Sequence, residues 1–126
     1  MKKIIHTSQA PAPVGPYSQA VQAGQFLFCS GQIAIDPATN QVSTAGVAEQ
    51  TELIMKNIEA VLTAAGGNFS HVVKTTIFLT SMNDFATVNE VYGKRFPQNP
   101  PARSTVAVAQ LPKGVPVEIE ILACLG

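Results

Sequence analysis

Charged residues are scarce in this chain. They make up 13% of its 126 residues, about half of the ~25% that is usual for soluble domains. Eight basic residues balance eight acidic ones, so the net charge is zero and gives no long-range attraction to nucleic acid or anionic lipid. Because so few charges cannot cover the surface of a small monomer, we expect part of that surface to be buried against other copies of the chain.

Recognisable catalytic and metal-binding sets are also missing. His6 and His71 lie far apart in the sequence, and neither stands beside a serine or cysteine in a nucleophile motif. No residues have the spacing of a zinc or calcium site, and Gly66 with Gly67 lacks the pattern of a phosphate-binding loop. The sequence therefore indicates no metal and no cofactor.

Two further absences concern the cell compartment. Residues 1–7 hold too few apolar residues for the core of a signal peptide, and no apolar run has membrane-spanning length. Cys29 and Cys124 lie in apolar segments without cationic neighbours, so we expect inert free thiols rather than a disulfide. We therefore expect a cytoplasmic protein that has no membrane partner.

Two helices are predicted from the apolar pattern. From Val47 to Ala65 apolar residues recur at intervals of three and four residues, which predicts an amphipathic helix that ends at Gly66. Residues 81–84 offer N-cap candidates for a second helix, which Pro97 ends. The buried stripe of that helix is expected to be Phe85, Val88, Val91, Tyr92 and Phe96.

The strands complete an α+β pattern within one domain, residues 1–126. The predicted strands cover residues 3–6, 20–22, 26–30, 72–80, 105–109 and 117–124. Strand 72–80 is apolar on both faces, so we expect it to be central. The order β-β-β-α-β-α-β-β predicts a mixed sheet with both helices on one face. The other face also needs a cover, which again favours self-association.

Arg103 is the first candidate for a functional residue. It is one of two arginines and follows Pro100 and Pro101, so it lies where a rigid loop becomes a strand. A guanidinium on a rigid mount offers a planar fork of donors that matches a carboxylate. The alternative is a structural ion pair.

Glu118 is the second candidate. It projects from the same strand face as Glu120, because alternate residues of a strand share a face. This strand follows the Arg103 strand across a short connection, so we expect the two strands to pair and to bring the carboxylate near the guanidinium. A carboxylate there could hold a water molecule and accept its proton. The alternative is a solvated edge.

Tyr17 is the third candidate, and Gly31 marks a close approach. Tyr17 ends the proline-rich loop of residues 10–17, where its hydroxyl could orient a small polar ligand, although a tyrosine can equally cap a core. Gly31 closes the strand that ends at Ser30, and a glycine there permits close approach of another backbone or of a ligand.

These residues lie in segments that resemble one family along almost the whole chain. The similar segments are residues 12–20, 30–33, 73–78, 82–89, 101–104, 111–113 and 117–120. They resemble the reactive-intermediate deaminases of the RidA family, also called YjgF. The resemblance implies a chorismate-mutase-like α+β fold of the bacillus type, a homotrimer whose sheets form a central barrel, and a ligand cleft at each subunit interface.

The resemblance also implies a reaction. Members of the family act as 2-iminobutanoate/2-iminopropanoate deaminases. They hydrolyse enamines and imines such as 2-aminoacrylate, which pyridoxal-phosphate enzymes release, to 2-oxo acids and ammonia without a cofactor. By resemblance Arg103 clamps the substrate carboxylate, Glu118 positions the attacking water, and Tyr17 lies in the cleft.

Three further positions follow from the resemblance. The backbone of Ser30 and Gly31 faces the substrate nitrogen. Thr105 stands where many relatives have cysteine, and its backbone N–H is expected to bind the substrate carboxylate. The small set is chemically sufficient, because an imine carbon is already electrophilic and the protein needs to supply only positioning and proton transfer.

Two other functions remain open from the sequence. A binding protein for 2-oxo acids or amino acids would need Arg103 but not Glu118. A ribonuclease or RNA-binding translation inhibitor would need phosphate neutralisation, for which the chain offers little beyond the pair Lys94 and Arg95.

Overall fold

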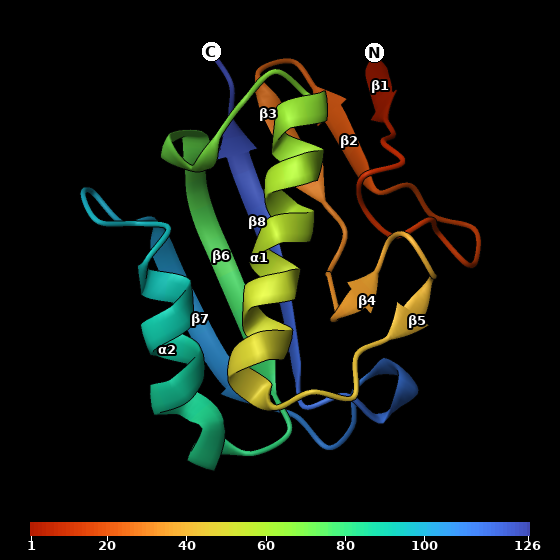
Figure 1. Cartoon of the computed structure of the whole chain (residues 1–126). Coiled ribbons are helices and arrows are strands. Elements are labelled where there is room, and N and C mark those ends of the chain that lie inside the picture. Colours follow the sequence, from red (N-terminus) through yellow and green to blue (C-terminus); the bar gives the residue numbers. More distant parts are fainter.

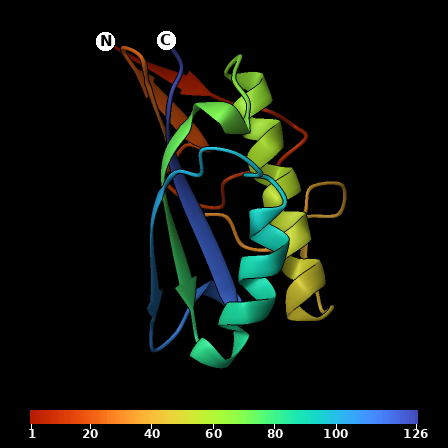
Figure 2. The same cartoon turned by 90° about the vertical axis from the view of Figure 1, so that its left-hand side faces the viewer.

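The computed structural model describes residues 1–126 as two layers, a six-stranded sheet and two helices on one of its faces (Figures 1 and 2). The sheet has the order β1-β2-β3-β8-β6-β7, and only the pair β6 and β7 is parallel. The predicted α+β class with a mixed sheet is therefore confirmed. The elements are β1 (Lys2–Ile5), β2 (Ala20–Ala23), β3 (Phe26–Cys29), β4 (Ile35–Asp36), β5 (Gln41–Val42), α1 (Val47–Ala64), η1 (Phe69–His71), β6 (Val72–Leu79), η2 (Met82–Asp84), α2 (Phe85–Gly93), β7 (Ala102–Ala107), η3 (Pro112–Gly114) and β8 (Val117–Cys124).

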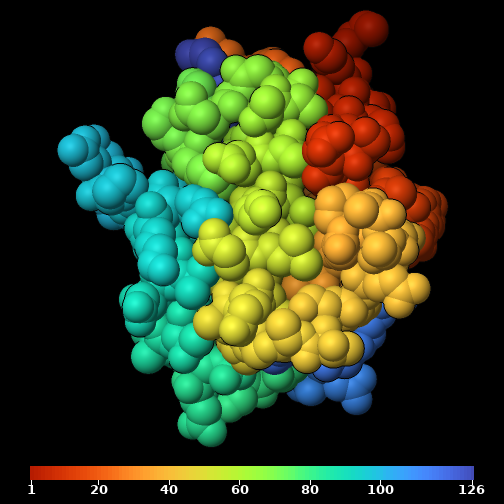
Figure 3. All heavy atoms as spheres, in the orientation of Figure 1, coloured from red at the N-terminus to blue at the C-terminus, as the bar shows by residue number.

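Helix α1 covers the middle of the sheet because its apolar stripe faces inward. Ile54, Met55, Ile58 and Leu62 are at most 1% exposed. The helix ends one residue before the prediction, and Gly66 adopts a φ of +83°, which lets the N–H of the next glycine bond to the Leu62 carbonyl. The space-filling view shows α1, α2 and the segment around β4 and β5 covering this side of the sheet (Figure 3).

Alternation along β6 and β8 separates a helix face from an open face. Ile77 of β6 and Ile119 and Ile121 of β8 are buried under the helices, while residues between them are more exposed. Strand β6 pairs with β8 on one side and β7 on the other. Its predicted central place is therefore confirmed.

The open sheet face carries exposed apolar side chains. Phe26 and Phe28 of β3 are 46% and 51% exposed, and Val106 of β7 is 42% exposed. Phe26 is the register partner of Cys124 and Phe28 of Leu122, so these side chains share one side of the sheet. No element of the chain covers this side (Figure 2). An apolar sheet face of this kind is a surface that self-association would bury.

The prediction that the Arg103 strand pairs with the last strand is wrong. Strand β6 lies between β7 and β8, so the two are not neighbours. The reason is the crossover: β6, α2 and β7 form a β-α-β unit, which places β7 parallel beside β6, and β8 then pairs with the opposite edge of β6. Strand β7 also begins at Ala102, so Arg103 lies inside the strand rather than before it.

The proline-rich loop is held to the sheet by one buried amide. Gln19 is 2% exposed, and its side chain accepts from the Thr7 N–H and donates to the carbonyls of Thr7, Ala10 and Pro11. Four backbone groups of a segment without regular structure are thereby satisfied by one side chain.

We expect Gln19→Leu to lower the free energy of unfolding by about 1–3 kcal/mol, because it leaves buried backbone groups without partners. Thermal unfolding at one fixed protein concentration measures the change. Gln22→Leu is the matched control, since the amide of Gln22 bonds only to the exposed Gly24 carbonyl. Equal melting temperatures for the two variants would contradict the role assigned to Gln19.

Candidate functional site

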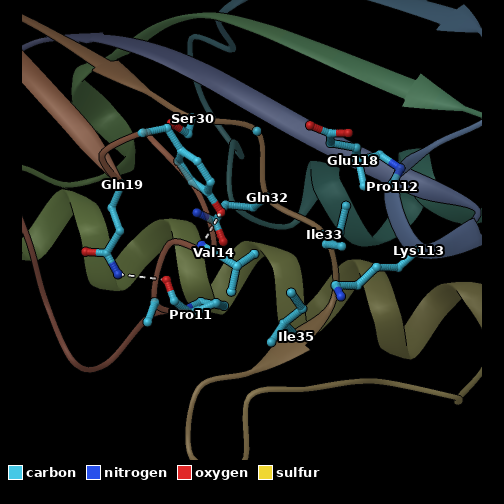
Figure 4. A pocket seen from close by; sticks show the side chains of 13 residues that line it. Pro11, Val14, Gln19, Ser30, Gln32, Ile33, Ile35, Pro112, Lys113 and Glu118 are labelled. Carbon is cyan, nitrogen blue, oxygen red and sulfur yellow. Dashed lines mark hydrogen bonds between the residues drawn. The ribbon is translucent and has the colours of Figure 1, made fainter.

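One cavity collects four of the residues expected at the site. It has a volume of about 400 Å³ and is lined by Tyr17, Ser30, Gly31 and Glu118 (Figure 4). It lies between the proline-rich loop, the segment after β3, and η3. The other lining residues are Pro11, Ala12, Val14, Gln19, Gln32, Ile33, Ile35, Pro112 and Lys113.

Glu118 is the acid of this cavity. Burial, and secondarily the negative charge of Glu120, raise the pKa of the Glu118 carboxyl. No protein group forms a hydrogen bond or ion pair with its carboxylate. Its two oxygens are therefore free to bind a ligand or water, and the raised pKa suits a group that both accepts and returns a proton.

The segment of Ser30 and Gly31 is fixed by hydrogen bonds on both sides. The N–H of Ser30 donates to the Gln19 carbonyl at 3.0 Å, and its hydroxyl donates to the Ser18 carbonyl at 2.6 Å. After Gly31, Gln32 and Ile119 exchange two backbone hydrogen bonds. The segment thus forms a rigid wall of the cavity, directly beside Glu118.

Tyr17 lies at the cavity and does not cap the core. The residue is 51% exposed, and its hydroxyl accepts a hydrogen bond of 3.4 Å from the Val14 N–H. That bond leaves the hydroxyl proton available to a ligand. The alternative considered from the sequence, a tyrosine that closes the core, does not describe this residue.

Arg103 lies outside this cavity, beside α2. Its guanidinium lies over the rings of Tyr92, at 5.2 Å, and Phe85, at 5.6 Å, and donates to the Asn89 amide oxygen at 2.6 Å. Such ring contacts attract a cation. The alternative of a structural ion pair is not realised within the chain, because the guanidinium meets a neutral amide. The ion pair belongs to the other arginine, Arg95, which binds Glu52 at 2.6 Å.

Thr105 accompanies Arg103 on the same side of β7. Both line a narrow crevice with Asn89 and Phe85 of the α2 segment. The hydroxyl oxygen of Thr105 is buried and has no hydrogen-bond partner. Arg103 and Thr105, the two residues that the resemblance assigns to the substrate carboxylate, therefore lie together, although away from the cavity.

The two groups of residues occupy opposite faces of the sheet. Arg103 is the register partner of Thr75, which is buried under α2 and bonded to the Tyr92 hydroxyl. Glu118 is the partner of Phe78, whose side chain points to the open face. Two strand spacings and three residues separate the two Cα atoms by roughly 14 Å. Within one chain, a small acid cannot touch both side chains.

Several residues near the site escaped the sequence analysis. Asn89 interrupts the apolar stripe of α2, four residues after Phe85 and three before Tyr92, and a polar residue on a buried stripe is a signal that could have identified it. Lys113 lines the cavity from η3 with a φ of 57°. The signal for Lys113 in the sequence is its place in segment 111–113, one of the segments that resemble the family.

The two cysteines are free thiols. Burial raises the pKa of the Cys29 thiol to about 12, so this thiol stays protonated and unreactive. The structure contains no group of His, Cys, Asp and Glu side chains that could hold a metal ion. None of its helices combines the length and the apolar character needed to cross a bilayer.

The fold and the cavity define a small α+β protein with a pocket beside a partly buried glutamate, and comparison with known proteins gives the family. A family model described as Endoribonuclease L-PSP matches residues 7–125. The chain therefore belongs to this family, the RidA or YjgF family.

Similar proteins cover nearly the whole chain. Protein DfrA of Myxococcus xanthus is 56% identical over 124 residues, which cover 97% of this chain and 95% of that protein. The 2-iminobutanoate/2-iminopropanoate deaminase of Mus musculus is 48% identical over 126 residues, with coverages of 100% and 93%. The crystal structure of RidA from a Psychrobacter species has a TM-score of 0.93 at 44% identity, with coverages of 97% and 98%.

We expect Glu120→Gln to lower the pKa of Glu118, because it removes the like charge that opposes ionisation. Other charged groups are Lys113 on η3, which lines the cavity, and Lys74 on β6 and Lys2 on β1, which share the open face. The change is measured as the midpoint of the Glu118 side-chain carbon signal in an NMR pH titration. Glu59→Gln on α1 is the control and should leave that midpoint in place. An unmoved midpoint in Glu120→Gln would show that burial alone sets this pKa.

Proposed function

We propose that this protein is a cofactor-independent imine deaminase, which hydrolyses 2-imino acids and their enamine tautomers, such as 2-aminoacrylate, to 2-oxo acids and ammonia. The observation that carries the proposal is a pair of unmatched charged groups. The Arg103 guanidinium has no carboxylate partner, and the Glu118 carboxylate has no donor. The mouse relative that bears the name of this activity, at 48% identity, supports the same reaction.

The working form in this proposal is a homotrimer. The Arg103 side of one copy lies against the Glu118 cavity of the next, so that each site combines two copies, and the open sheet faces form a central barrel of the chorismate-mutase-like type. Two observations support this assembly. The catalytic groups stand on opposite faces in one chain, and the open face exposes Phe26, Phe28 and Val106.

In the binding step, Arg103 holds the substrate carboxylate with its guanidinium fork, and the Thr105 backbone N–H adds a further donor. The hydrogen bond to Asn89 and the rings of Phe85 and Tyr92 keep the fork aimed. Tyr17 and the backbone of Ser30 and Gly31 orient the imine nitrogen.

In the chemical step, Glu118 directs a water molecule to the electrophilic imine carbon. The water oxygen forms the new C–O bond, and Glu118 takes a water proton. Glu118 then gives that proton to the imine nitrogen as the C=N bond becomes single, which regenerates the carboxylate. The resulting carbinolamine then loses its hydroxyl proton to Glu118, the nitrogen takes that proton, and the C–N bond breaks. The products are the 2-oxo acid and ammonia, and the carboxylate is unchanged.

The proposed place of action is the cytosol, where pyridoxal-phosphate enzymes that act on amino acids would release such intermediates. Free thiols at Cys29 and Cys124 fit a reducing compartment.

One rival function has a specific observation behind it. The family description names an endoribonuclease. RNA binding needs a basic surface, but the net charge of the chain is zero, and Arg95 of its basic pair is engaged by Glu52. Strong RNA binding that weakens steeply with salt would favour this rival.

A protein that only binds 2-oxo acids would share Arg103 with the deaminase and is separated from it by the assay below.

Ammonia release from 2-aminoacrylate or 2-iminobutanoate, freshly generated by a pyridoxal-phosphate enzyme, tests the activity. We expect Glu118→Gln to lower kcat by about 10²- to 10⁴-fold, the usual contribution of a placed acid or base. Arg103→Ala should mainly lower kcat/KM, because it removes the carboxylate clamp. Glu52→Gln, outside the proposed site, is the control. A wild-type protein that binds a 2-oxo acid without accelerating ammonia release would be a binding protein.

A mixing experiment tests whether two copies share one site. Arg103→Ala and Glu118→Gln are refolded separately and as an equal mixture. Every mixed trimer has one junction with both native residues, so random mixing should restore about a quarter of the wild-type activity. At substrate concentrations well below KM, each variant alone should show only a small residual activity. If the mixture is as inactive as its components, Arg103 and Glu118 do not act in one shared site.

A further inference from the structure

Gly31 lies against the carboxylate of Glu118. A Cβ atom built on Gly31 would overlap with Oε2 of Glu118 and would lie 2.9 Å from its carboxyl carbon and 3.2 Å from its Cγ. The φ of Gly31 is outside the left-handed region. Glycine is therefore needed here for the space that it leaves and not for its backbone conformation.

The backbone at Gly31 is held in place by hydrogen bonds and cannot shift to make room for a larger residue at this position. On one side the Ser30 N–H is bonded to the Gln19 carbonyl, and on the other Gln32 and Ile119 exchange hydrogen bonds of 2.8 and 3.0 Å. Ile119 is also the chain neighbour of Glu118, so the same pair of bonds fixes both contact partners. The movable member of the contact is the Glu118 carboxylate, the far end of a flexible side chain.

We propose that Gly31 is a positioning residue for catalysis, whose missing side chain provides the seat that holds the Glu118 carboxylate toward the water it directs. This role differs from a contact of the Gly31 backbone with the substrate, and it rests on the proposed function for its catalytic meaning. Packing against the Cα of Gly31 replaces the hydrogen bonds that would otherwise fix this carboxylate, since the protein supplies none. Both of its oxygens thus remain available for the water and the substrate nitrogen.

The test is Gly31→Ala, alone and combined with Glu118→Gln. In the native background we expect kcat to fall at least tenfold while KM changes less than twofold, because the Arg103 clamp is untouched. In the Glu118→Gln background the same alanine should lower kcat no further, since glutamine fills the same space without the acid. Equal losses in both backgrounds would assign Gly31 to the substrate directly and overturn the proposal, as would unchanged kcat in Gly31→Ala.

A matched control exists elsewhere in the chain. A Cβ on Gly46 would lie 2.9 Å from Oε1 of Glu49, so Gly46→Ala also brings a methyl group against a carboxylate, but at the start of α1 and away from the cavity. We expect Gly46→Ala to keep the native kcat. Thermal unfolding and sedimentation of both alanine variants show whether the fold and assembly persist.

A readout without turnover separates this proposal from the proposed function. An alanine at position 31 pushes the carboxylate out of its seat toward solvent. Its pKa, which burial raises, should fall toward the ordinary glutamate value in an NMR titration, with Glu120, Lys113 and Lys74 unchanged. If the wild-type protein proves inactive on imines and Gly31→Ala still lowers the pKa of Glu118, the positioning role of Gly31 stands and the deaminase function is refuted. A titration midpoint that does not move in Gly31→Ala would refute the seat, whatever the activity.

Discussion

Strand β6 imposes the constraint on which the arrangement of this molecule depends. Its backbone bonds to β7 on one edge and to β8 on the other, so the two strands that carry Arg103 and Glu118 are kept apart. Three register positions along β6 separate the two partners, Thr75 and Phe78, and residues three apart on a strand point to opposite faces. The same hydrogen bonds that complete the sheet therefore prevent one chain from closing a site around both groups.

The pairing of charged side chains also separates the Arg103 surface from the Glu118 surface. In a chain with so few charges, Arg95 and Glu52 neutralise each other, whereas Arg103 and Glu118 meet no opposite charge. The guanidinium rests on aromatic rings and a neutral amide, which orient it without cancelling its charge. The carboxylate is half-buried, and burial raises its pKa. Two charged groups left unmatched on separate surfaces favour a ligand, a second copy, or both as their partners.

The local sequence pattern predicts most of the helices and strands of this fold, but it does not predict which strands pair. The 3.6-residue period of α1 and the alternation of β8 are properties of adjacent residues, and both elements form where the sequence predicts them. The neighbours of β8 depend on the β6-α2-β7 crossover, which local pattern does not reveal. The short connection between β7 and β8 predicted that these two strands pair, whereas β8 lies between β3 and β6. At the site, residue type indicated Glu118, Tyr17 and the close approach at Gly31. The identity of the approaching group, a carboxylate distant in sequence, needed the fold.

The way in which Glu118 is held decides what it can do. Backbone or side-chain donors would fix a carboxylate firmly, but they would stabilise its charged form, lower its pKa and occupy its lone pairs. Contact with a bare Cα leaves the oxygens open instead, and burial of the group raises its pKa. Hydrolysis of an electrophilic C=N bond needs a group that takes a proton from water and gives it back to nitrogen near neutral pH. A glycine beside the acid meets that need, because any side chain in its place would collide with the carboxylate that the proposed reaction requires.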